Sequence, residues 1–253
     1  MKESRLYSNV QTGTISVESE NAASIKGIVT KTFILLLITA SVAIGVAITF
    51  MGVIKNNPVT YYGVLILSII LAFIFALTGR VSIRAAKVCS VGYALCEGIF
   101  VGSVTRIVEL YVKGAGVLCV FATLIIYGIM LILYGSGYLR VDNSRGRGIL
   151  QMLGRLMISC LIIGLTLALF TMIVTLIRGY DSSTFMLYVL VEVILLFYGV
   201  FSLALNFGEA SAVVSSGCDK RYEWMVSLGM EISLIYIYIR MLYLVLEIAG
   251  RRK

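Results

Sequence analysis

Seven apolar runs dominate this chain of 253 residues. A transmembrane helix needs about 20 mainly apolar residues, and each run reaches that length. The runs cover approximately 32–54, 60–79, 85–105, 114–139, 150–177, 184–208 and 225–248. Charged residues make up only 13% of the chain, whereas a soluble domain carries about 25%. We therefore expect an all-α membrane protein, built as a bundle of seven transmembrane helices in a lipid bilayer.

The first thirty residues are polar and carry charges of both signs. They contain no short apolar stretch followed by small residues, which is the pattern of a signal peptide. We expect residues 1–30 to form a mobile cytoplasmic tail and residues 31–253 to form the transmembrane domain. The short connections between runs leave no room for a separate soluble domain.

The distribution of Lys and Arg predicts the orientation in the membrane. Basic residues concentrate in cytoplasmic loops, and here most of them lie in the tail and in the connections after the second, fourth and sixth runs. The amino terminus is therefore predicted to be cytoplasmic. Arg251, Arg252 and Lys253 then fall on the outer side of the membrane, although basic residues favour the cytoplasmic side. Either the charges of the other loops determine the orientation, or one of the seven segments does not cross the membrane fully. The net charge of +8 is spread over these loops and does not predict nucleic-acid binding.

The residue types present exclude several kinds of chemistry. The chain has no histidine, which removes Ser-His and Cys-His catalysis and the commonest metal ligand. The five cysteines show no CxxC spacing, and four of them lie inside apolar runs, as packing residues do. With no nucleophile motif and no pair of aspartates within a run, we expect no enzyme activity, no cofactor and no metal site.

The third run combines a carboxyl with a row of small residues. Glu97 lies near its middle, and a carboxyl in lipid costs several kcal/mol unless it is protonated, paired or hydrated. Small side chains recur every four residues at Ser90, Ala94, Gly98 and Gly102. Such a ridge lets two helix backbones approach closely. Because Glu97 flanks this ridge, we expect its carboxyl to face a seam between helices.

The sixth run carries a polar stripe. Glu192, Gly199 and Asn206 recur at intervals of seven, with Ser202 and Glu209 close to the same side. Seven residues return almost to the same angle on a straight helix. The stripe is consistent either with hydrogen bonds between helices or with a hydrated pathway.

The seventh run is polar on two opposite faces. One face holds Ser233, Tyr236, Arg240, Tyr243 and Glu247, and the other holds Glu231 and Tyr238. Neither face can meet lipid without cost, so we expect the last helix to be central and enclosed by the other six. Arg240 keeps its proton, and we expect it to pair with a glutamate from the third or sixth run.

Three segments carry further information: Ile28–Thr32, the segment Tyr93–Gly102 followed by Glu109, and the block from Leu205-Asn206-Phe207 through Glu223-Trp224 to Tyr238. Together they resemble the Bax inhibitor-1 family in its bacterial form. The resemblance covers about half of the chain. It implies a seven-helix bundle with the last helix at its centre, in a bacterial plasma membrane. It also implies a pH-sensitive calcium leak, gated by two carboxyls on the sixth and seventh spans that share protons.

The sequence departs from the family at the implied sensor. Asn206 aligns with the acidic position of the sixth span and Arg240 with that of the seventh, and neither side chain changes charge near neutral pH. One hypothesis is a calcium or other cation leak without its usual sensor, with a route lined by Glu97, Glu192 and Glu209. The other is a non-transporting protein that modulates other membrane proteins, such as a quality-control protease. We expect any calcium flux to be weak and nearly flat between about pH 6 and 8.

Overall fold

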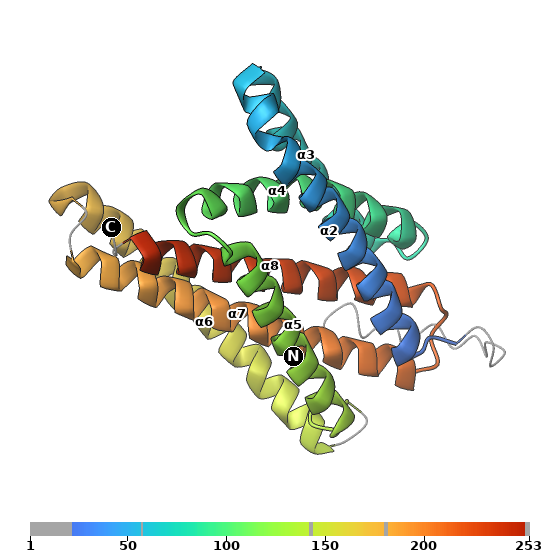
Figure 1. Ribbon diagram of the computed structural model, residues 1–253. Coiled ribbons are helices and arrows are strands. Elements are labelled where there is room, and N and C mark those ends of the chain that lie inside the picture. The colour runs from blue at the N-terminus through green and yellow to red at the C-terminus, as the bar shows by residue number, and fades with distance from the viewer. Residues whose placement is uncertain (1–21, 57, 142–143, 180–181, 251–253) are drawn as a thin grey trace.

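The computed structural model describes residues 22–56, 58–141, 144–179 and 182–250 (Figure 1). Most of the expected mobile tail, residues 1–21, lies outside this part of the chain, and so do Arg251, Arg252 and Lys253. Within the described residues the secondary structure is helical, apart from one isolated bridge between Ala22 and Asp219.

Seven helices account for the described chain, and each is long and apolar enough to cross a membrane. In chain order they are α2 Ile25–Asn56, α3 Pro58–Val81, α4 Ala86–Tyr111, α5 Ala115–Gly135, α6 Ser144–Arg178, α7 Ser182–Ser215 and α8 Tyr222–Gly250. The predicted class, an all-α bundle of seven membrane-spanning helices, is therefore confirmed.

The first helix begins earlier than the apolar run predicted. α2 starts at Ile25, because the Ser24 hydroxyl accepts a 3.0 Å hydrogen bond from the backbone N–H of Gly27 and so caps the helix. The backbone N–H of Ala23 also donates to the carbonyl of Cys218 at 2.8 Å. The boundary expected between residues 30 and 31 thus falls inside α2, and residues 22–30 are part of the bundle.

α8 occupies the centre of the molecule (Figure 1). It packs against α2, α3, α4, α5 and α7, and its side chains Leu228, Ile237 and Leu242 are fully buried. The expectation that all six other helices enclose it is wrong for α6, which packs along α7 on the outer side. The outward faces of α3 and α6 carry large exposed apolar side chains, as helices that face lipid do.

The small-residue ridge of α4 lies against α2. A Cβ placed on Gly98 would come within 2.7 Å of the Cβ of Val42, and one placed on Gly102 would collide with the backbone of Ala43. Ser90 and Ala94, on the same ridge, are fully buried. The absence of side chains at these glycines therefore lets α2 and α4 pack backbone to backbone, which in turn brings α2 close to α8.

Candidate functional site

Glu231 is a fully buried carboxyl within the central helix. It lies on α8 and is 0% exposed. The Thr39 hydroxyl of α2 lies 2.8 Å from its Oε1 and 3.2 Å from the carbonyl oxygen of Ala94. Oε2 of Glu231 has no hydrogen-bond partner among the described residues. A buried hydrogen-bond acceptor without a partner costs about 1–3 kcal/mol. Helix packing alone therefore does not explain why a carboxyl occupies this position.

A second carboxyl and a phenol lie close to Glu231. Glu97 and Tyr93, both on α4, interact electrostatically with it. Tyr93 is buried, and Glu97 is partly buried. No Lys or Arg in the described chain forms an ion pair with Glu97 or Glu231. The structure thus leaves the electrostatically coupled carboxyls of Glu97 on α4 and Glu231 on α8 without an ion-pair partner among the described residues.

Asn206 joins α7 to α8 through neutral hydrogen bonds. Its amide nitrogen donates to the carbonyl of Gly229 at 2.9 Å and to the hydroxyl of Ser233 at 2.8 Å. Ser233 also lies 2.9 Å from the hydroxyl of Ser202. The polar stripe of the sixth span therefore makes hydrogen bonds between helices at this level, which is one of the two roles that its pattern allowed.

An ion pair lies beside Asn206. Arg80, at the end of α3, places its Nη1 3.0 Å from Oε2 of Glu209 on α7. The same guanidinium group occupies the space next to Gly229, where an added Cβ would collide with it. A fixed positive charge from α3 therefore lies between α7 and α8, next to the Asn206 side chain.

Arg240 forms the ion pair that its position on the seventh span predicted. Its Nη1 lies 3.2 Å from Oε1 of Glu192 on α7, and its guanidinium stacks 5.0 Å from the ring centre of Tyr236. The structure does not bring Arg240 to Asn206, whose partner on α8 is Ser233. Asn206 and Arg240, the two positions aligned with the implied sensor, therefore bond to different partners.

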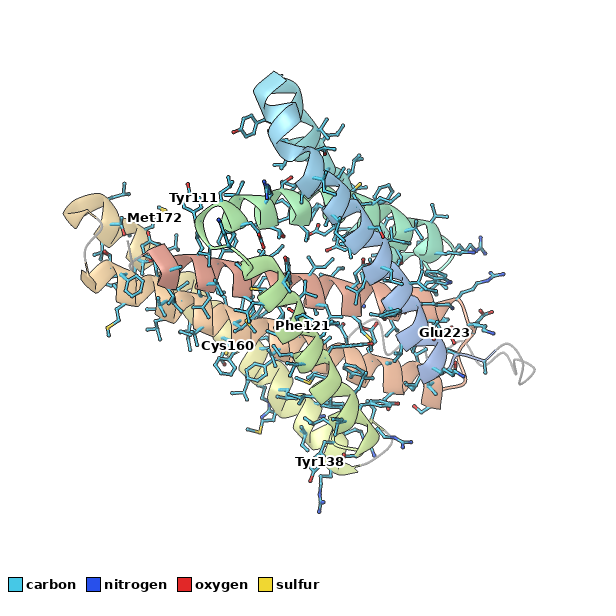
Figure 2. All side chains as sticks on the ribbon, viewed as in Figure 1. Tyr111, Phe121, Tyr138, Cys160, Met172 and Glu223 are labelled. Atoms are coloured by element: carbon cyan, nitrogen blue, oxygen red, sulfur yellow. The ribbon has the colours of Figure 1, made fainter. Side chains whose placement is uncertain are left out.

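Sequence reasoning assigned no role to two further buried polar residues, Thr39 and Glu223. Thr39 gave no signal, because threonine is common in apolar helices, where its hydroxyl bonds the preceding turn. Glu223, in the first turn of α8, is 0% exposed and forms a 2.6 Å ion pair with Lys31 (Figure 2). An acidic residue in the first turn of a helix is favoured by the helix dipole, which could have marked Glu223 as a structural residue.

The fold and its polar interior define a multi-pass membrane protein that lies in a lipid bilayer and is organised around a central helix. A family model described as Bax inhibitor 1 like matches residues 5–250. The chain belongs to this family, and the match extends well beyond the half of the chain on which the sequence resemblance depended. Comparisons with curated proteins and with solved structures gave no match.

Proposed function

We propose that this protein is a weak cation leak, with calcium as the first ion to test, and that Glu231 is the ligand at the narrowest part of the route. The observation that carries the proposal is the free Oε2 of this fully buried carboxyl. Calcium takes oxygen ligands from carboxylates, carbonyls and water. An oxygen acceptor in the middle of a membrane bundle is a functional-site hypothesis by default.

The surroundings of Glu231 support transient passage and not tight binding. Glu97 is the second carboxyl of the pair, and no group of three or more acidic, cysteine or histidine side chains in the described chain could hold a metal ion. Calcium sites that bind tightly use six to eight oxygens. Two carboxyls and one hydroxyl, from Thr39, would therefore give a weak site that an ion enters and leaves.

The usual sensor of the family is replaced by groups that do not change charge near neutral pH. Asn206 and Ser233 are neutral partners at the seam between α7 and α8. Arg80 and Arg240 each place a fixed cation near that seam, paired with Glu209 and Glu192. Each of these cations neutralises a carboxylate that would otherwise attract a divalent ion, so we expect low flux.

The same two guanidinium groups favour a second candidate function. If both ion pairs only tie α3 and α8 to α7, then the protein conducts no ions, and it modulates other membrane proteins by binding them. Neither candidate is an enzyme. For both we propose a bacterial plasma membrane with the amino terminus in the cytoplasm.

Calcium flux into liposomes that contain the purified protein tests the proposal. We expect a low flux above that of protein-free liposomes, and a reduction of several-fold in Glu231→Gln, which removes the charge and keeps the shape and the Thr39 bond. Glu109→Gln is the matched control, because Glu109 lies near the end of α4 and accepts its hydrogen bond from the Gly116 backbone. Flux equal to that of empty liposomes, from protein shown to be folded, would reject the leak and leave the non-transporting candidate.

A further inference from the structure

α2 and α8 begin at the same end of the bundle, where α3 also connects to α4 (Figure 1). A cleft lined by basic side chains lies there. Its volume is about 330 Å³. Its polar and aromatic lining residues are Lys31, Arg84, Lys87, Lys220, Arg221 and Trp224. Positive charge from the first turns of α2, the start of α4 and the α7–α8 connection thus converges on one recess.

Most of this charge forms no ion pair within the described part of the chain. Lys31 is held in place, because its Nζ lies 2.6 Å from Oε2 of the buried Glu223 and 3.2 Å from the carbonyl of Lys220. The other four basic side chains form no ion pair in the part of the chain that the structure describes. Like charges that converge on a concave surface focus a positive potential, which attracts anions.

The indole of Trp224 lines the cleft. The ammonium groups of Lys31 and Lys87 lie 5.1 and 5.8 Å from the ring centre of Trp224, within the range of a cation–π interaction. Ile83 adds an apolar side chain to the same wall. Tryptophan at the end of a transmembrane helix lies at the level of the lipid headgroups, so the cleft combines a cationic part with an apolar part at that level.

We propose that this cleft binds the phosphate group of an anionic phospholipid. The guanidinium of Arg84 and the ammonium of Lys87 donate hydrogen bonds to the phosphate oxygens. Trp224 and Ile83 pack against the glycerol and the first carbons of the acyl chains. Clusters of Lys and Arg next to membrane spans attract anionic headgroups. The lipid is favoured over a soluble phosphate because the apolar wall would otherwise face water. The site is separate from the polar interior and does not depend on the proposed leak.

Trp224 is the one tryptophan of the chain, so its fluorescence reports on the cleft. The test is a titration of the purified full-length protein in neutral detergent with short-chain phosphatidylglycerol. The comparison ligands are the phosphatidylcholine of the same chain length, glycerol 3-phosphate and inorganic phosphate. We expect a saturable change in Trp224 emission with phosphatidylglycerol and at least about tenfold weaker responses to the other three.

Two double variants complete the test. Arg84→Gln with Lys87→Gln removes two exposed cleft charges and should weaken phosphatidylglycerol binding about tenfold or more, since each basic residue near an anionic membrane contributes roughly 1 kcal/mol. Lys113→Gln with Arg147→Gln removes the same charge from exposed residues outside the cleft and should change it less than about twofold. Equal binding of both phospholipids, equal binding of free phosphate, or equal weakening by both double variants would each overturn the proposal.

Discussion

The hydroxyl of Thr39 on α2 lies 2.8 Å from Oε1 of Glu231 on α8, and so joins an outer helix to the buried carboxyl of the central one. This contact depends on the glycine ridge of α4. Because Gly98 and Gly102 let α2 pack tightly on α4, Thr39 also reaches the carbonyl of Ala94. Packing between two helices therefore determines the polar environment of a residue on a third.

Replacing Thr39 with valine should destabilise the protein. The change keeps the size of the side chain and removes the hydrogen-bond partner of Glu231, which leaves a buried acceptor unsatisfied at a cost of about 1–3 kcal/mol. Unfolding in detergent, followed by circular dichroism, measures the difference. Thr49→Val is the matched control, because the exposed Thr49 bonds only to its own helix. Equal midpoints for the two variants would contradict a role for the Thr39–Glu231 bond.

Leucine at Gly98 should disrupt the fold more than glutamine at Glu97. The Cβ alone would lie 2.7 Å from the Cβ of Val42 and 2.9 Å from the backbone oxygen of Thr39, so α2 would have to move away. Overpacking of this kind costs about 1–3 kcal/mol or more. Folded yield after size-exclusion chromatography measures it, with Gly128→Leu as control, since Gly128 has open space around it. Equal yields of Gly98→Leu and Glu97→Gln would count against close packing at the ridge.

Truncating Arg240 to alanine should cost less than breaking a fully buried ion pair. Loss of one partner in a fully buried pair costs about 3–5 kcal/mol. The side chains of Arg240 and Glu192, however, are 27% and 18% exposed. We therefore expect about 1–3 kcal/mol, from the uncompensated carboxylate. Adding Glu192→Gln should recover part of this loss, measured as a double-mutant cycle in the same unfolding assay. A purely additive cycle would show that the pair is not coupled.

Hydropathy and polarity were sufficient to predict the architecture. The seven runs lie inside or close to the seven helices, and the two polar faces around Glu231 and Arg240 predicted that the last helix is central. The start of α2 was missed because the apolar run begins only after Lys31, whereas the helix begins at the Ser24 cap. A hydropathy profile does not detect a helix cap, because the cap is formed by a single hydroxyl group.

Contacts between residues of different helices could not be predicted from the sequence. Whether Ser233 or Arg240 faces Asn206 depends on how far α8 is shifted along α7, and the spacing within each helix does not contain this shift. The sequence limited the ion-pair partner of Arg240 to a few glutamates. Which of them forms the pair, Glu192, is determined by the packing of α7 on α8. The basic cleft joins segments far apart in the sequence, such as Lys31 and Arg221, which the loops alone did not connect.

Calcium flux through the unmodified protein should be weak, and the seam between α7 and α8 should give it no pH dependence between about pH 6 and 8. The groups at the seam between α7 and α8, Asn206 and Ser233, do not titrate in this range. The double variant Asn206→Asp with Ser233→Asp should acquire a pH-dependent flux, because two carboxyls at hydrogen-bond distance share protons. The difference between the two profiles, measured in the same liposomes, is the test. Asn206→Asp alone is the control, because it places a single carboxyl at the seam. Equal pH profiles for the double variant and the unmodified protein would contradict the prediction.

A steep pH response in the unmodified protein would come from a sensor outside the seam between α7 and α8. Glu97 and Glu231 are then the groups to test, because they form the carboxyl pair without a counter-charge among the described residues. In that case Glu231→Gln should flatten the profile, because the amide cannot exchange a proton with Glu97 in this range. Glu192→Gln should leave the profile steep, since Glu192 is paired with Arg240. The two variants thus distinguish a sensor between α4 and α8 from one at the α7–α8 seam.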